Sequence, residues 1–157
     1  MTPARTTRST CIALAAFALA APYAAAATFR VDDSASLPSE SSTPMKWKSL
    51  APGRNAGNLV EGASLITVRL NVAAWQNRNG KIYMTLPPLP LGEVTADWTT
   101  QGTLLPGHLV SGNRTLVYAG PLRTKFIEDT IVLKLQADGR RLTSAQRLQF
   151  QFEIDIE

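Results

Sequence analysis

The most restrictive feature of the sequence is the strict alternation of apolar and polar residues at its end. From Leu148 to Glu157 every second residue is apolar, and each residue between them is polar or charged. A period of two places successive side chains on opposite faces of a strand, so this segment predicts a β-strand with one wholly apolar face. The apolar positions are Leu148, Phe150, Phe152, Ile154 and Ile156.

Shorter alternations of the same period occur along most of the chain. They cover residues 29–37, 45–48, 66–72, 82–86, 94–98, 115–118 and 131–137. No apolar pattern of helical period lasts for three turns beyond the first 27 residues. Seven or eight short strands without helices predict an all-β sandwich or barrel.

Turn and loop signals lie between these segments. Asn79-Gly80, Ser111-Gly112-Asn113 and Asp138-Gly139 are typical of tight turns. The prolines that follow residue 86 cannot donate to a strand ladder and therefore end that segment. Residues 51–62 contain Pro52 and three glycines and are expected to form a loop.

The first 27 residues have the composition of a secretory signal peptide. Arg5 and Arg8 give a basic start, an apolar run extends from Cys11 to Ala21, and the small residues at 25–27 suit a signal peptidase. The apolar run is too short for a helix that crosses a ~30 Å hydrocarbon core. We therefore expect export, with cleavage after Ala27 and no membrane span. A lipid anchor would need its cysteine just after the apolar run, whereas Cys11 lies at its start.

Removal of 27 of the 157 residues would leave 130, with 14 basic and 12 acidic side chains and no cysteine. That length suits one domain. A chain without cysteine has no disulfide, no thiolate metal site and no thiol nucleophile. The basic residues are scattered, which argues against nucleic acid as a partner. We expect an extended N-terminal segment over residues 28–52 and a β-sandwich domain over residues 53–157.

Few residues have the chemical types that catalysis or metal binding needs. His108 is the only histidine, so a metal site or a catalytic triad would lack a companion, and we expect an exposed loop residue. Glu128 and Asp129 are adjacent and would face opposite sides of a strand. Glu153 and Asp155 share one strand face, where an exposed charged row is expected rather than an acid–base pair. We therefore predict no enzymatic activity, no metal and no cofactor.

The three tryptophans leave an alternative open. Trp98 is in register with Val94 and Ala96, which indicates a core position. Trp47 and Trp75 could either pack internally or present aromatic faces to a ligand. The alternative function is therefore a self-contained exported β-sandwich that binds a glycan, a lipid or a protein.

An alternating segment at the start of the processed chain and an alternating strand at its end together resemble the chaperone–usher fimbrial subunits. In that family each subunit is an immunoglobulin-like β-sandwich that lacks one strand, and the N-terminal extension of the next subunit fills the gap. The resemblance implies a single immunoglobulin-like domain and a non-enzymatic structural subunit of a fimbrium or pilus. The donated side chains would be Phe29, Val31, Asp33, Ala35 and Leu37. The acceptor edge would be the final strand, Leu148 to Ile156.

The resemblance also implies partners and a route. The partners would be other fimbrial subunits, a periplasmic chaperone and an outer-membrane usher, and the protein would pass through the periplasm to the cell surface. The chain lacks the paired cysteines of the commoner members. Asp33 lies at the centre of the donor face, where a carboxylate without a partner is costly to bury.

Overall fold

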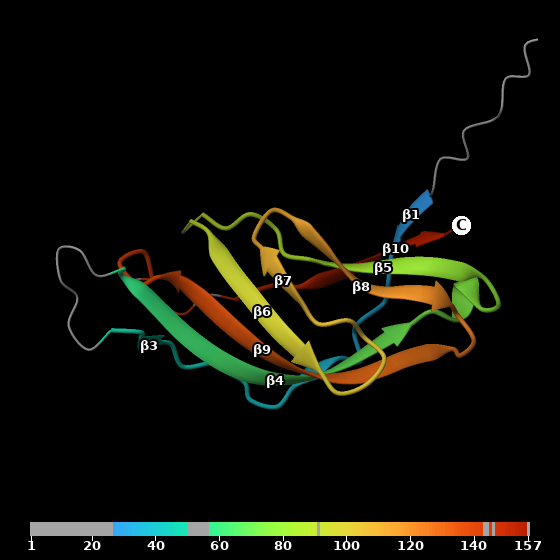
Figure 1. Ribbon diagram of the computed structural model, residues 1–157, viewed down its shortest axis with the longest axis horizontal. Helices are drawn as coiled ribbons and strands as arrows, with labels where there is room; N and C mark the ends of the chain where they lie inside the picture. Colours follow the sequence, from blue (N-terminus) through green and yellow to red (C-terminus); the bar gives the residue numbers. More distant parts are fainter. Residues whose placement is uncertain (1–26, 50–56, 91, 143–144, 146, 157) are drawn as a thin grey trace, which may run out of the picture.

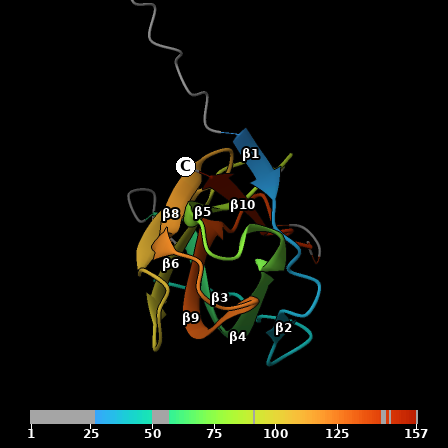
Figure 2. The ribbon, with the colours of Figure 1, turned by 90° about the vertical axis from the view of Figure 1, so that its right-hand side faces the viewer.

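The structure is a computed structural model that describes residues 27–49, 57–90, 92–142, 145 and 147–156. Within these residues the chain forms two antiparallel β-sheets, and the three-residue 3₁₀ turn η1 (Ala73–Trp75) is the only helical element. The view in Figure 2 shows β1, β10, β5 and β8 in one layer and β9, β4 and β2 in the other. The prediction of an all-β chain is confirmed, and the two facing sheets are consistent with a β-sandwich.

The smaller sheet has four strands, and its last strand in sequence lies inside it. The strands occur in the spatial order β1 (Ala27–Arg30), β10 (Gln151–Ile156), β5 (Asn79–Thr85) and β8 (Arg114–Pro121). On β10, Phe152, Ile154 and Ile156 face the core and are each at most 6% exposed. The first strand and the last strand of the described chain are therefore neighbours (Figure 1).

The larger sheet is built around two long strands. The strands occur in the order β2 (Leu37–Pro38), β4 (Leu59–Asn71), β9 (Phe126–Asp138), β6 (Val94–Thr100) and β7 (Gly107–Val110), and β3 (Lys46–Trp47) also pairs with β4. β4 and β9 pair antiparallel over all 13 residues of each. Figure 1 shows them running side by side along most of the length of the molecule.

The period of two determines which side chains reach the core. Every second residue of β9, from Ile127 to Ala137, is buried, and the residues between them are exposed or half-buried. Trp98 is 3% exposed, and its Nε1–H donates to the Leu105 carbonyl at 2.9 Å, so the predicted core position is confirmed. The buried apolar residues of both sheets form one cluster.

Several predicted boundaries differ from the structure. β4 begins at Leu59, inside the predicted loop, because Val60 and Gly62 continue the inward register of the strand. Gly62 is needed there, since a Cβ atom would lie 2.6 Å from Met45 Sδ. Asn79-Gly80 opens β5 instead of forming a turn. The positive φ that a turn requires occurs two residues earlier, at Asn77 (66°).

The two long sides of the sandwich are closed in different ways. On one side, β7 belongs to the larger sheet and β8 to the smaller, and the predicted turn at Ser111-Gly112-Asn113 joins them. On the other side, the segment from β1 to β3 pairs first with β10 and then with β4. The expected N-terminal segment therefore lies against both sheets. The expected boundary between residues 52 and 53 lies outside the described residues.

Asp129 is the buried charged residue among those described, and it organises the loop before β7. Its Oδ2 accepts the Leu104 N–H at 2.8 Å, and its Oδ1 accepts the N–H groups of Gln101 (3.2 Å) and Thr130 (2.7 Å). Glu128 faces the opposite way, as predicted, and pairs with Arg69 at 2.9 Å on the surface.

Replacement of Asp129 by alanine should therefore destabilise the protein strongly. The change leaves the buried Leu104 N–H without its acceptor and removes the bonds from Gln101 and Thr130, and we expect a loss of about 2 to 3 kcal/mol in the free energy of unfolding. Glu128→Ala is the matched control, because an exposed ion pair contributes at most ~1 kcal/mol. Urea unfolding of both variants gives the comparison, and equal losses would contradict the assignment.

Candidate functional site

The edge of β10 is covered by the first described residues of the chain. β1 pairs antiparallel with β10, in a register that runs from Ala27 opposite Ile156 to Arg30 opposite Glu153. The ladder continues by one residue, because the Val31 N–H donates to the Phe152 carbonyl at 2.8 Å. All four residues of β1 are exposed, as expected for a short edge strand.

Polar contacts hold β1 on the outer face of the smaller sheet. Thr28 Oγ1 donates to Asp155 Oδ1 at 2.6 Å, and Arg114 Nη2 donates to Asp155 Oδ2 at 2.8 Å. Arg114 also lies over the Tyr83 ring, 3.8 Å from its centroid. The charged row predicted on this strand face is therefore paired with a cation from β8.

Apolar contacts hold β1 on the inner face, and they differ in depth. Phe29 shares the face of Ile154 but remains 44% exposed, with its ring 5.8 Å from that of Trp75. Val31, which follows β1, is fully buried. Val31 is therefore the deepest anchor of the N-terminal segment in its own sandwich.

After Val31 the chain leaves the smaller sheet through a turn. Asp32 forms a bridge to Asn71 of β4, and its Oδ1 accepts the Ser34 N–H at 3.1 Å. The Ser36 N–H donates to the Asp33 carbonyl at 2.8 Å and closes the turn. The Ser36 hydroxyl accepts the Arg69 N–H at 2.9 Å and donates to the Arg69 carbonyl at 3.3 Å, which fixes the turn to β4.

The five predicted donor residues consequently do not share one strand face in the lone chain. Phe29 and Val31 lie along the edge of β10, whereas Asp33 and Ala35 lie in the turn. Leu37 belongs to β2, opposite Thr67 of the other sheet, and is 67% exposed. The single strand expected over residues 29–37 is interrupted because Asp32 and the serines after it stabilise a turn.

The predicted acceptor strand is partly paired. Phe152, Ile154 and Ile156 are buried in β10, which begins at Gln151. Leu148 and Phe150 precede the strand, are half-buried and pack against the core. No backbone hydrogen bond connects residues 147–150 to another described part of the chain.

His108 lies on β7, not in a loop, and its side chain is exposed as predicted. Its Nδ1 lies 2.7 Å from Asp97 Oδ1 of the neighbouring strand, and both side chains are about half-exposed. The nearby Thr115 hydroxyl donates to the backbone carbonyl of His108 rather than to the ring. Within the described residues the pair has no nucleophile in contact, and no group of three potential metal ligands occurs.

The two tryptophans considered for ligand binding are not brought together. Trp47 pairs with Val60 near the start of β4, and Trp75 follows its end at Asn71. The strand between these points spans roughly 35 Å at ~3.3 Å per residue. One ligand platform therefore cannot contain both rings.

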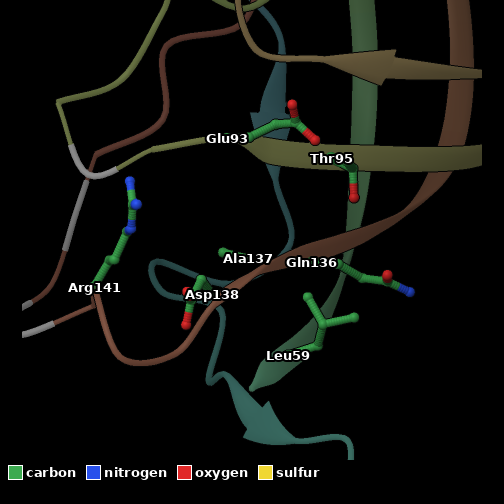
Figure 3. A pocket seen from close by; sticks show the side chains of 7 residues that line it. All are labelled: Leu59, Glu93, Thr95, Gln136, Ala137, Asp138 and Arg141. Atoms are coloured by element: carbon green, nitrogen blue, oxygen red, sulfur yellow. The ribbon is translucent and has the colours of Figure 1, made fainter. Parts of the chain in front are cut away.

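A shallow hollow of about 330 Å³ lies near the start of β6 (Figure 3). Its lining residues are Leu59, Glu93, Thr95, Gln136, Ala137, Asp138 and Arg141. Asp138 is already paired with Arg140 at 2.8 Å, and hydrogen bonds from Arg140 lower the pKa of Asp138. The side chains of Glu93 and Arg141 stand apart in Figure 3, so the hollow presents no converging set of polar groups.

No protein-family model, no curated protein sequence and no solved structure is significantly similar to this chain. The described residues contain no helix long and apolar enough to cross a membrane. The predicted signal peptide lies outside the described residues, except for Ala27.

The turn after Val31 should respond to acid. Hydrogen bonds from Ser34, and a weaker one from Asn71, hold the pKa of Asp32 below its ordinary value of 3.8. A lowered pKa in the folded chain means that the carboxylate stabilises the turn fully above pH 3.8 and loses this effect as the pH falls through the lowered value. We expect the amide protection factors of Ser34 and Ser36 to fall in that range.

The Asp32→Ala variant should show low protection without this additional loss in acid. Asp33→Ala is the control, because only the backbone carbonyl of Asp33 takes part in the turn. An acid transition that persists in Asp32→Ala would assign the effect to another group.

Proposed function

We propose that the protein is a non-enzymatic structural subunit of a surface fibre of the fimbrial type, assembled by addition of a donated strand at β10. One observation carries this proposal. Of the residues that the structure describes, only β1 and Val31 cover the edge of β10, and β1 is a four-residue strand exposed at every position. Strand addition at such an edge is a general mode of recognition, in which the ladder gives affinity and alternate side chains give specificity.

The order of the strands supports the same proposal. β10 is the last strand in sequence, and the place beside it is taken by the first strand, antiparallel to it. An immunoglobulin-like sandwich whose final strand is supplied by an N-terminal segment would have this arrangement. The immunoglobulin-like topology is therefore part of the proposal.

The net free energy of exchanging this strand between copies is small. A segment from a second copy would restore the same pairs that β1 gives up, so the exchange over residues 28–31 of the processed chain is nearly neutral in free energy. Burial of a valine side chain contributes about 1.5 to 3 kcal/mol, and Val31 is the one fully buried side chain that must be released. Once β1 leaves, the uncovered edge would be prone to aggregation, which would give a periplasmic chaperone and an outer-membrane usher their roles.

A second candidate function is the self-contained exported binding module. The complete burial of Val31 in its own sandwich favours it, because the lone chain already occupies the position beside β10. The two candidates differ in whether β1 can leave.

A disulfide lock on the full processed chain separates them. Val31 and Phe152 are opposite and hydrogen-bonded, so the adjacent pair, Arg30 and Glu153, is a non-hydrogen-bonded pair with closely spaced Cα atoms. Cysteines at both positions meet the ~4.4–6.8 Å Cα separation that a disulfide needs. They face outward, and the expected mature chain has no other cysteine.

We expect the reduced R30C/E153C variant to form concentration-dependent polymers and the oxidised form to remain monomeric, as measured by size-exclusion chromatography with light scattering. The single variant R30C controls for loss of the arginine. If the unmodified chain and both redox forms stay monomeric and none captures a labelled peptide of residues 28–37, the fibre proposal is wrong and the self-contained module is favoured.

A further inference from the structure

The segment of residues 147–150 continues the alternation of β10 but has no ladder partner among the residues that the structure describes. Leu148 and Phe150 are half-buried and pack against the core, whereas Arg147 and Gln149 are exposed. The described residues supply no backbone hydrogen bond to this segment. The chain's own N-terminal strand does not reach it, because that strand leaves the edge after Val31, opposite Phe152.

The register of β1 on β10 specifies what would lie opposite this segment. Since Arg30 is opposite Glu153, an uninterrupted strand would place Asp33 opposite Phe150 and Ala35 opposite Leu148. These positions belong to the same alternating series as Phe29 and Val31. The alternation therefore continues after Val31, with Ala35 as an apolar inner residue. Asp33 is the unfavourable position, because its carboxylate would face Phe150 and is costly to bury without a partner.

The turn at Asp32–Ser36 is held by contacts that can be exchanged for a ladder. Its bonds are the Ser34 N–H to Asp32, the Ser36 N–H to the Asp33 carbonyl, and the two bonds between the Ser36 hydroxyl and the Arg69 backbone. The turn is needed in the lone chain because Leu37 and Pro38 pair with β4 on the other sheet. β2 has only two residues, both exposed, so its release uncovers little apolar surface.

We infer that residues 147–150 are a docking edge for residues 33–36 of a second copy of this chain, reached when the turn at Asp32–Ser36 opens into a strand. This inference rests on the proposed function and deepens it. The exchanged strand then pairs beyond Phe152, where the chain's own strand does not. Exchange between copies gains ladder bonds at Phe150 and Leu148 that the described residues of the lone chain do not supply.

Peptide capture by the full processed chain tests the inference. A labelled peptide of residues 28–37 should bind at least tenfold more tightly than one of residues 28–32, as measured by fluorescence anisotropy at equilibrium. In this register the N–H groups of residues 33 and 35 face β10, and that of Ser34 faces away. Ala35→Pro in the long peptide should therefore remove the tenfold gain, whereas Ser34→Pro should retain most of it.

Variants of the protein test the turn that must open and the edge at which the peptide would dock. Ser36→Ala removes both bonds to Arg69 and should speed uptake of the long peptide severalfold. Ser39→Ala is the control, because Ser39 uses only its backbone N–H, toward Leu65. Leu148→Ala should weaken binding of the peptide of residues 28–37 and leave binding of the peptide of residues 28–32 unchanged.

The outcomes separate the two proposals. Equal binding of the long and short peptides would overturn the docking edge and leave strand addition at β10 intact. If neither peptide binds, and the unmodified chain and both redox forms of R30C/E153C stay monomeric, the docking edge and the fibre proposal are both wrong.

Discussion

Burial of the inner face of β10 against the larger sheet is the interaction on which both sides of the sandwich depend. Phe152, Ile154 and Ile156 bring the smaller sheet into the common core, and β5 secures β10 along one edge. The remaining edge is covered by a few residues from the far end of the sequence. The opposite side of the molecule differs, because a short covalent turn from β7 of the larger sheet to β8 of the smaller sheet closes it. The β7–β8 side of the sandwich is thus closed by the continuous chain, whereas the edge of β10 depends on pairing with β1.

The described core is stabilised without disulfides, so its polar groups must be satisfied by hydrogen bonds. Asp129 illustrates this, since its carboxylate accepts three backbone N–H groups around the loop before β7. Among the described residues no buried side-chain nitrogen or oxygen lacks a partner. A core of this kind has high specificity, because an unpaired buried polar group would cost ~1–3 kcal/mol. The charged contacts of the surface, such as Arg69 with Glu128, contribute much less.

The sequence predicted the strands wherever burial on one face controls the pattern, as in β9, β6 and β10. It failed where tertiary contacts override local signals. Asn79-Gly80 has the composition of a turn, yet Gly80 is buried in β5, where a Cβ atom would lie 3.1 Å from Ile154 Cδ1. For the candidate site, the period of two placed Phe29 and Val31 on one face of a strand, and in the structure they lie along the edge of β10 of the same chain. Their role as side chains donated to a neighbouring subunit stays a prediction. The period of two could not show the turn after Val31, because the bonds from Ser36 to Arg69 join residues 33 positions apart.

The long pairing of β4 with β9 has a mechanical consequence. The two strands run along the long axis of the molecule and share a ladder of 13 residues each (Figure 1). Their hydrogen bonds are perpendicular to the strands. A force that pulled β4 and β9 in opposite directions along that axis would therefore load the bonds together in shear instead of opening them one at a time from an end. Along this direction the sandwich has the geometry of a tension-bearing element.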